Sequence, residues 1–205
     1  MKKYAKLEAI ASYLPKFVEE NRGLSVQFPD WEMDRVANKI GIEQRHIAAP
    51  DEYTSTLATK AAERLFASSD LDPQAVDYLI LVTQSPDFFL PTTAALVHRD
   101  LGLREGCGSV DLNLGCSGYV AGLGFAKGLI ESEQSVNVLL ITSDTYSKFV
   151  NPADRAVRTI FGDGATATWV SSNGTANSVG RVLTGTDGNG AGHLLVPSGG
   201  LRNGE

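Results

Sequence analysis

The chain has 205 residues, of which 42% are hydrophobic and 20% are charged, and its formal net charge is −6. These values are typical of a soluble globular protein with one α/β domain, or with one domain and the opening of a second. No apolar stretch approaches the roughly 20 residues that a membrane-spanning helix requires, and Lys6 and Glu8 interrupt the segment where a signal peptide would have its apolar core. The chain has no lysine- or arginine-rich block of the kind that binds nucleic acids. We therefore expect a cytoplasmic protein with neither membrane nor nucleic-acid partners.

The first third of the chain alternates between strand and helix patterns. Residues 6–13 resemble a strand, which Pro15 closes. Asp30 has the position of a helix N-cap after a proline, and Gly41 would end that helix. Residues 54–69 carry apolar side chains at helical spacing and form the next expected helix.

The rest of the chain continues the alternation. Residues 76–83 are almost continuously apolar, which is typical of a strand in a sheet that is covered on both faces. Further strands are expected at residues 108–114, 136–142, 165–171 and 179–184, and further helices at residues 91–101 and 119–130. This order predicts an α/β fold with helices on both faces of a mostly parallel sheet. The sequence becomes rich in Gly, Ser and Asn after residue 171, so we expect one domain over residues 1–171 and the start of another over 172–205.

A cysteine lies where a buried strand runs into a small-residue helix. Cys116 stands in this turn between Gly115 and Gly118. A thiol at a helix N-terminus faces unsatisfied N–H groups and the positive end of the helix dipole, which favours the thiolate and can bind an oxyanion. A small core cysteine is the alternative. Cys107 lies in a glycine-flanked loop and is expected to be structural, and the two cysteines show neither a metal-site nor a disulfide-framework spacing.

Three segments resemble β-ketoacyl-acyl-carrier-protein synthase III, a condensing enzyme with the thiolase fold. They are the Gly-Ile-Glu-Gln-Arg-His-Ile-Ala run at residues 41–48, the nucleophile turn at residues 111–119, and the Asn-Pro-Ala-Asp-Arg and Phe-Gly-Asp-Gly-Ala runs that begin at residues 151 and 161. The resemblance implies a mixed, mostly parallel five-stranded sheet with helices on both faces, the first half of a duplicated fold. It also implies that Cys116 is the nucleophile that accepts an acyl group.

The resemblance implies further site residues. Arg155 matches the arginine that packs against the adenine of coenzyme A, a role that suits a planar guanidinium. Leu90 stands where the family often has a phenylalanine that reaches across a dimer to close the partner's acyl pocket, and Phe161 matches a residue near that pocket. A solvated loop arginine, a helix-entry hydrophobe and a core aromatic are the respective alternatives.

The sequence also departs from the family. The family often has a tryptophan opposite the adenine-packing arginine, and counting back from Gly41 puts its place at Arg35, which leaves Trp31 as a helix-face anchor. A carrier-protein-bound acyl donor therefore remains an alternative to acyl-coenzyme A. The family's catalytic His and Asn come from its C-terminal half, and none of the three histidines of this chain matches that His. They are His46, His98 and His193.

The implied reaction is the condensation of an acyl-coenzyme A with malonyl-acyl-carrier protein through an acyl-cysteine, without a cofactor, in a homodimeric complete protein. We expect the 205-residue chain to be an incomplete, truncated form of that enzyme. The alternatives are acyl transfer or condensation in a polyketide, quinolone or surface-polysaccharide pathway, and a non-catalytic partner subunit. Retention of Cys116 argues against the last of these.

Overall fold

The computed structural model describes residues 3–175 and 178–196, and its centre is a five-stranded mixed sheet in the order β1-β7-β6-β4-β5. The strands are β1 (Lys6–Tyr13), β4 (Tyr78–Val82), β5 (Gly108–Leu112), β6 (Asn137–Asp144) and β7 (Gly164–Ser171). β4 pairs in parallel with β5 and β6, whereas β7 pairs antiparallel with both β6 and β1. β7 therefore runs against the other four, so the expected mixed, mostly parallel sheet is confirmed.

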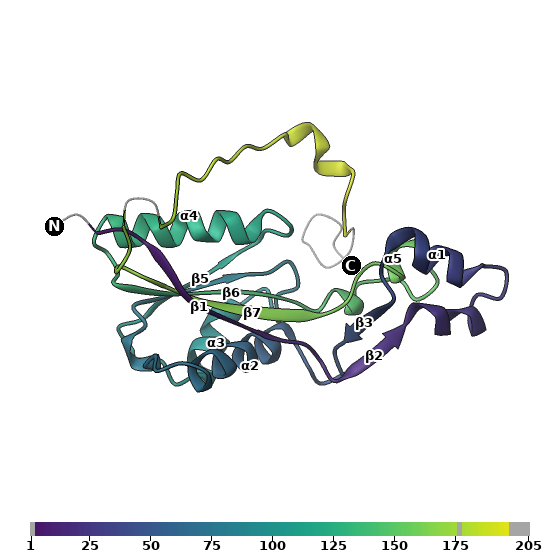
Figure 1. Ribbon diagram of the computed structural model, residues 1–205, viewed down its shortest axis with the longest axis horizontal. Coiled ribbons are helices and arrows are strands. Elements are labelled where there is room, and N and C mark those ends of the chain that lie inside the picture. Colours follow the sequence, from purple (N-terminus) through teal and green to yellow (C-terminus); the bar gives the residue numbers. More distant parts are fainter. Residues whose placement is uncertain (1–2, 176–177, 197–205) are drawn as a thin grey trace.

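Helices cover both faces of this sheet, as Figure 1 shows. α2 (Thr54–Ala67) and α3 (Thr93–Asp100) lie on one face, and α4 (Gly118–Glu131) lies on the other. Successive strand residues point to opposite faces, so Leu79 and Leu81 join the core below α2 while Ile80 and Val82 join the core below α4. Both faces of the sheet are buried at β4, which explains why this strand is apolar throughout. Each fully buried leucine or isoleucine contributes about 1.5–3 kcal/mol to folding.

Glycines bring α4 close to the sheet. A Cβ on Gly122 would lie 2.6 Å from Leu140 Cδ1, and a Cβ on Gly118 would collide with the Val82 side chain. The first two turns of α4 therefore pack directly on β4 and β6. This contact holds the N-terminus of α4, and the turn before it, at the carboxyl end of the parallel strands.

Two expectations about local structure are wrong. The helix expected from Asp30 is α1 (Met33–Ile40), and Glu32 rather than Asp30 occupies its N-cap position. Gly41 does end it, with a left-handed φ of 72° that favours glycine. Residues 179–184 form no strand and run as irregular chain beside α4, where Val182 lies next to Gly124.

A second, two-stranded sheet had no counterpart among the expected elements. β2 (Phe17–Glu20) pairs antiparallel with β3 (Gln44–Ile47) at one end of the molecule, next to α1 and the short helix α5 (Arg155–Arg158). Four residues are too few to show a clear alternation of apolar and polar side chains. Among the residues described, no helix combines the length and the apolarity needed to cross a membrane.

Candidate active site

The candidate site lies where three neighbouring parallel strands end. Gln84 follows β4, Cys116 follows β5, and Tyr146 follows β6, and β4 is the middle strand of the three. The carboxyl ends of parallel strands meet at one edge of a sheet, and ligands of α/β proteins bind there. The sequence pattern points to Cys116 but not to Gln84 or Tyr146, although each of these two residues comes within two residues of a buried strand's end.

Cys116 lies in the turn between β5 and α4, two residues before the helix begins. Its side chain is exposed, whereas Cys107 is buried. The turn is closed by a hydrogen bond from the Gly118 N–H to the Gly115 carbonyl, at 2.8 Å. The strand-to-helix setting predicted for Cys116 is therefore confirmed, and the thiol is open to a reagent or substrate.

Asp144 ties the ends of β4 and β6 together. Its Oδ1 accepts hydrogen bonds from the Gln84 N–H at 2.8 Å, from the Ser85 N–H and hydroxyl, and from the Thr83 hydroxyl at 3.1 Å. Burial raises the pKa of Asp144, while these hydrogen bonds oppose the rise. The carboxylate fixes the backbone of Gln84 and thereby directs its side chain toward the nucleophile turn.

Tyr146 is held between Gln84 and Phe161. Its hydroxyl donates a hydrogen bond to Gln84 Oε1, and its ring stacks on Phe161 with centroids 5.1 Å apart and planes inclined by 18°. Gln84 Oε1 lies so close to Gly115 that a Cβ there would collide with it. Burial raises the pKa of Tyr146, and the charges of Asp144 and Cys116 add to the rise. Phe161 thus reaches the surroundings of Cys116 through Tyr146.

Arg155 lies in the connection between β6 and β7, which also contains Tyr146 and Phe161, and it contacts two aromatic side chains. Its guanidinium lies 5.0 Å from the Trp31 ring centroid and 5.8 Å from that of Phe28. Trp31 precedes α1, so the contact joins the α1 region to the first residue of α5. Trp31 is therefore the aromatic partner of Arg155, and its interpretation as only a helix-face anchor is wrong. Arg35, the position given by counting, instead forms a surface ion pair with Glu32 at 3.6 Å.

An ion-pair network supports this loop. Glu19 of β2 bridges Arg45 of β3 and Arg158 of α5, and the Arg45 guanidinium also reaches the Phe161 carbonyl at 3.3 Å. Asp154 caps α5 by accepting from the Ala156 and Val157 N–H groups, both at 3.1 Å. The two-stranded sheet therefore positions both Arg155 and Phe161.

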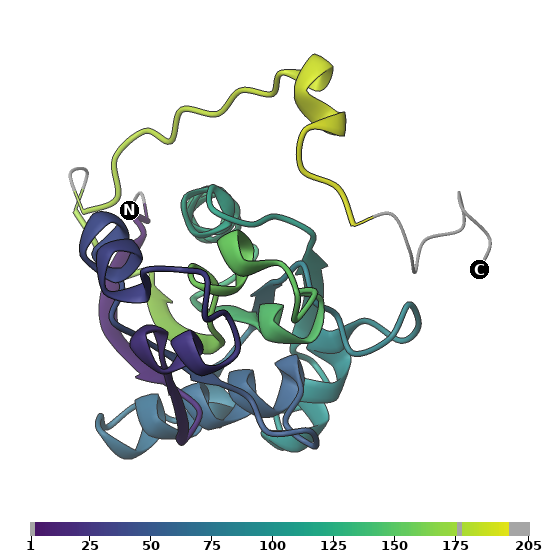
Figure 2. The same ribbon diagram turned by 90° about the vertical axis from the view of Figure 1, so that its right-hand side faces the viewer.

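The remaining candidate residues lie apart from Cys116 or have structural partners. Leu90 is 86% exposed, in the connection between β4 and α3 that projects from the body of the molecule (Figure 2). His46 Nδ1 is 2.6 Å from the Pro15 carbonyl and His98 Nε2 is 3.1 Å from the Arg104 carbonyl, so both rings bind backbone. His193 follows a short turn of 3-10 helix in the segment after β7.

The chain is similar to one family of proteins. The profile of the family described as 3-oxoacyl-[acyl-carrier-protein] synthase III matches residues 110–188, which include Cys116. The β-ketoacyl-[acyl-carrier-protein] synthase III of Chlamydia caviae is 39% identical over 199 residues, which make up 97% of this chain and 59% of that protein. The corresponding protein of Neisseria meningitidis serogroup B is 37% identical and is covered to 60% of its length.

Solved structures agree with the sequence comparison. A crystal structure of a 3-oxoacyl-(acyl-carrier-protein) synthase III superimposes with a TM-score of 0.95 at 45% identity, over 98% of this chain and 60% of that one. The priming β-ketosynthase of the R1128 polyketide pathway gives a TM-score of 0.84 at 27% identity, over 93% of this chain and 56% of that one. This chain thus spans about 60% of the length of the relatives it matches. Over almost its whole length, the chain is therefore similar to the N-terminal portion of the 3-oxoacyl-[acyl-carrier-protein] synthase III family.

Proposed function

We propose that Cys116 accepts an acyl group from a thioester, and that the complete protein condenses this group with malonyl-acyl-carrier protein. The observation that carries the proposal is the exposed Cys116 thiol in the turn between β5 and α4, within the residues that match the family profile. The donor in the relatives' reaction class is a thioester, whose carbonyl carbon is open to a thiolate.

The proposed first step is acyl transfer. The Cys116 thiolate attacks the thioester carbonyl, the carbonyl oxygen takes the negative charge, and the N-terminal N–H groups of α4 stabilise that oxyanion. Collapse of the intermediate breaks the carbon–sulfur bond to the donor, whose thiolate leaves and takes a proton. In the second step, malonyl thioester loses carbon dioxide and its carbanion carbon attacks the acyl-cysteine carbonyl, which frees the Cys116 thiolate. We assign this second step to a His and an Asn of the complete protein.

We propose coenzyme A as the carrier of the acyl donor. The Arg155 guanidinium lies 5.0 Å from the Trp31 ring centroid, and the two groups would have to separate to roughly 7 Å to take an adenine between them, with the charge of Arg155 attracting phosphate. A carrier-protein-bound donor is the alternative. Binding of coenzyme A that is lost in both Arg155→Ala and Trp31→Ala would support the first donor, whereas binding unchanged in both would support the second.

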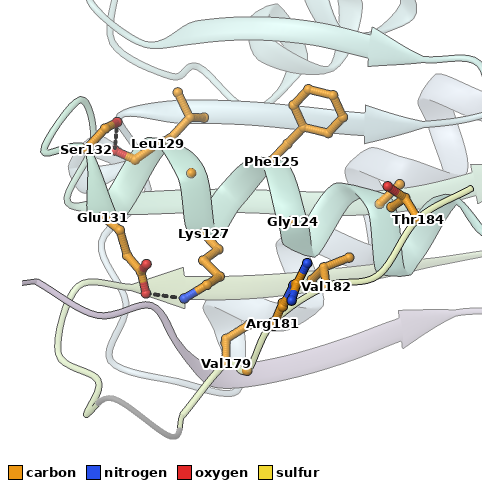
Figure 3. A pocket seen from close by; sticks show the side chains of 13 residues that line it. Gly124, Phe125, Lys127, Leu129, Glu131, Ser132, Val179, Arg181, Val182 and Thr184 are labelled. Atoms are coloured by element: carbon orange, nitrogen blue, oxygen red, sulfur yellow. Dashed lines mark hydrogen bonds and ion pairs between the residues drawn. The ribbon is translucent and has the colours of Figure 1, made fainter.

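We further propose that residues 172–205 open a second domain, which packs on the outer face of α4. A groove of about 820 Å³ lies between that face and residues 179–184, and Figure 3 shows Phe125, Leu129 and Val182 along it. Phe125 is 56% exposed, and α4 is largely apolar apart from the ion pair of Lys127 and Glu131. A helix of that kind is normally buried on all sides.

The test of the proposed acyl transfer is the site of acylation. The chain is incubated with acetyl-coenzyme A or treated briefly with iodoacetamide, and mass spectrometry of its peptides locates the adduct. We expect the adduct on Cys116, because Cys107 is buried and burial raises the pKa of its thiol. Cys116→Ser should abolish acylation, while Cys107→Ser is the matched control that retains it. Preferential modification of Cys107 would contradict the assignment of Cys116 as the residue that is acylated.

A polyketide-priming condensation is the second candidate function. The similarity to the priming β-ketosynthase of the R1128 pathway favours it, with 27% identity over 93% of this chain. Both functions use the same acyl-cysteine. Assays of the complete protein with the malonyl-loaded carrier proteins of the two kinds of pathway distinguish them.

A further inference from the structure

We propose that Arg158 is a positioning residue that sets the affinity of the chain for a coenzyme A donor, an inference that rests on the proposed use of coenzyme A. Arg155 and Arg158 are the first and last residues of α5. Within the part of the chain that the structure describes, Arg155 has no ion-pair partner, and its guanidinium lies against the rings of Phe28 and Trp31. Arg158 instead has several polar partners. The first arginine is therefore free to meet a phosphate, whereas the second holds structure.

The Arg158 guanidinium bonds to three segments of the chain. Its Nη1 donates to Gln27 Oε1 at 2.5 Å and to the Pro152 carbonyl at 3.2 Å, and its Nη2 donates to Glu19 Oε1 at 2.7 Å. Glu19 belongs to β2, Pro152 lies in the loop that leads into α5, and Gln27 lies four residues before Trp31. One side chain thus ties the segment that carries Trp31 to the helix that carries the other half of the aromatic contact.

The backbone carries this restraint from Gln27 to the indole ring. The N–H groups of Gln27 and Phe28 both donate to the Leu24 carbonyl, at 3.0 and 2.9 Å, and the Trp31 N–H donates to the Phe28 carbonyl at 3.0 Å. These consecutive turns make residues 24–31 a short, internally bonded unit. The helix α5 is a single turn, so the bonds of Arg158 fix its whole length. Both sides of the contact are therefore held by the same guanidinium.

Glu19 anchors Arg158 to the interior of the molecule. Its other carboxylate oxygen pairs with Arg45, whose side chain is 4% exposed and whose Nε donates to Asn21 Oδ1 at 2.8 Å. Asn21 is fully buried, and its amide donates to the Thr159 carbonyl at 2.8 Å, directly after α5. Burial disfavours the charge of Glu19, but the hydrogen bonds from Arg158 and Arg45 outweigh it and hold the pKa of Glu19 below its usual range. Such a doubly paired, largely buried carboxylate holds its partners more firmly than an exposed ion pair does.

The network determines what moves when an adenine enters between Arg155 and Trp31. The guanidinium and the ring centroid, 5.0 Å apart, must separate to roughly 7 Å. With Arg158 in place, these two side chains can separate while the segments that carry them stay bonded to each other. Without Arg158 the ligand has to order both segments as it binds, and ordering on binding lowers affinity.

The experiment compares a donor that has the nucleotide with one that lacks it. Isothermal titration calorimetry measures the dissociation constant of coenzyme A. Intact-mass spectrometry follows the acetylation of Cys116 by acetyl-coenzyme A and by S-acetylpantetheine, which offers the same thioester on the same arm. Acrylamide quenching of tryptophan fluorescence reports on Trp31 without any ligand, because the other tryptophan, Trp169, is 2% exposed.

Two variants break the ion pair with opposite changes in net charge. Arg158→Gln removes a positive charge and Glu19→Gln removes a negative one, so any long-range effect on the anionic ligand would differ in sign between them. In both variants we expect the dissociation constant of coenzyme A and the half-saturating concentration of acetyl-coenzyme A to rise roughly tenfold, at an unchanged maximal rate. Acetylation by S-acetylpantetheine should stay the same, and the quenching of Trp31 should increase.

Two further variants serve as comparisons. Arg158→Lys keeps the charge and one bond to Glu19 but loses the other branches of the guanidinium, so its dissociation constant should lie between those of the unaltered chain and Arg158→Gln. Arg22→Gln is the matched control, since it removes an equal positive charge from an exposed ion pair with Asp34, 3.2 Å apart, at the same end of the molecule. Its dissociation constant should stay within about twofold of that of the unaltered chain.

The outcomes separate the role of Arg158 from the proposed donor. Unchanged binding of coenzyme A in either Arg158→Gln or Glu19→Gln, shifts of opposite sign in the two, or an equal loss with S-acetylpantetheine would overturn the role of Arg158 and leave the donor intact. Absence of coenzyme A binding by the unaltered chain would overturn the proposed donor. In that case, stronger quenching of Trp31 in both variants but not in Arg22→Gln would still establish that Arg158 positions Trp31, and unchanged quenching would overturn that as well. If Arg158→Gln does not fold, Glu19→Gln and Arg158→Lys decide the matter.

Discussion

Two aspartates hold opposite ends of the paired strands β4 and β6, and their electrostatic settings differ. Asp144 lies just beyond the last residue pair of β4 and β6, and burial raises its pKa. Asp77 precedes β4 and accepts the N–H groups of Val136 at 2.7 Å and Asn137 at 2.9 Å, next to an ion pair with Arg104. Burial disfavours the charge of Asp77 too, but the hydrogen bonds and Arg104 outweigh it and hold its pKa below the usual 3.8.

The sign of the Asp77 shift gives a prediction on stability. A carboxyl whose pKa is lowered by folding stabilises the native state above its unfolded pKa, and this contribution is lost as the pH falls through the folded pKa. Asp77→Asn should lower the free energy of unfolding by about 1–3 kcal/mol at pH 7, because the N–H groups of Val136 and Asn137 lose a charged acceptor. Urea denaturation should show the difference from the unaltered chain shrinking below pH 4. Asp72→Asn, which removes a charge that accepts only the exposed Gln74 N–H, is the control. A difference that stays constant from pH 7 to pH 2 would contradict this account.

At the scale of elements, α4 depends on glycines that face the sheet. Gly122 faces Leu140 and Val82, whereas a Cβ on Gly128 of the same helix would meet no atom within 4 Å. Gly122→Ala should destabilise the chain by roughly 1–3 kcal/mol, because the helix must move off a well-packed sheet. Gly128→Ala should instead stabilise it by about 0.5–1 kcal/mol through the lower conformational entropy of the unfolded alanine. Thermal denaturation measures both, and equal shifts in the two variants would show that the close packing of α4 does not matter.

The strand β5 lies at one edge of the five-stranded sheet. It pairs only with β4 within the five-stranded sheet, so one row of its backbone N–H and C=O groups lacks a neighbouring strand there. An open edge of this kind invites pairing with another chain. We propose a homodimer whose sheet continues from β5 to β5 across a two-fold axis, which would also bring the exposed Leu90 loop toward the partner.

Light scattering at micromolar concentration tests the homodimer. We expect twice the mass of the chain, and we expect Ser109→Pro to give a folded monomer. Gly108 and Leu112 bond to the β4 side, so the N–H of residue 109 faces the open edge, and a proline there disrupts the approach of a partner strand without breaking the pairing with β4. Val138→Pro in the central strand β6 is the contrasting control, which should fail to fold rather than dissociate. A monodisperse monomer of the unaltered chain would contradict the proposed interface.

At the scale of the whole molecule, the proposed acylation and the proposed condensation belong to different parts of the complete protein. The decarboxylation of malonyl thioester needs donors at the thioester oxygen, and loss of one such donor typically costs about 10²–10³ in rate. None of the three histidines in this chain matches the one that the family uses, and two of them bind backbone carbonyls. We therefore predict acylation of Cys116 without condensation.

The prediction is checked with radiolabelled malonyl-acyl-carrier protein and acyl-coenzyme A. The 205-residue chain alone should release no labelled carbon dioxide and form no ketoacyl product, while its Cys116 becomes acylated. The complete protein, assayed in parallel, should form product. Turnover by the chain alone would mean that the decarboxylating groups lie among these residues.

The sequence by itself determined the elements whose signal is local. Three elements were predicted: the apolar strand β4, the first strand at Lys6–Tyr13 and the small-residue helix after Cys116. Burial on both faces of a strand requires consecutive apolar residues, and close helix packing requires small ones, so both can be recognised within a short stretch of sequence. Cys116 was identified for the same reason: the strand, the turn and the helix that define its setting are adjacent in the chain.

Only the tertiary structure decided which distant residues meet. Gln84 reaches Gly115 in the turn that contains Cys116, and Tyr146 reaches Gln84, because β4, β5 and β6 are neighbours in the sheet. The local periodicity of the sequence does not reveal this order of strands. Trp31 meets Arg155 because the two-stranded sheet and its ion pairs fold the α1 region back onto α5, a contact that a count along the chain does not reveal. The short strands β2 and β3 were missed, since four residues carry too little pattern and their stability comes from pairing with each other.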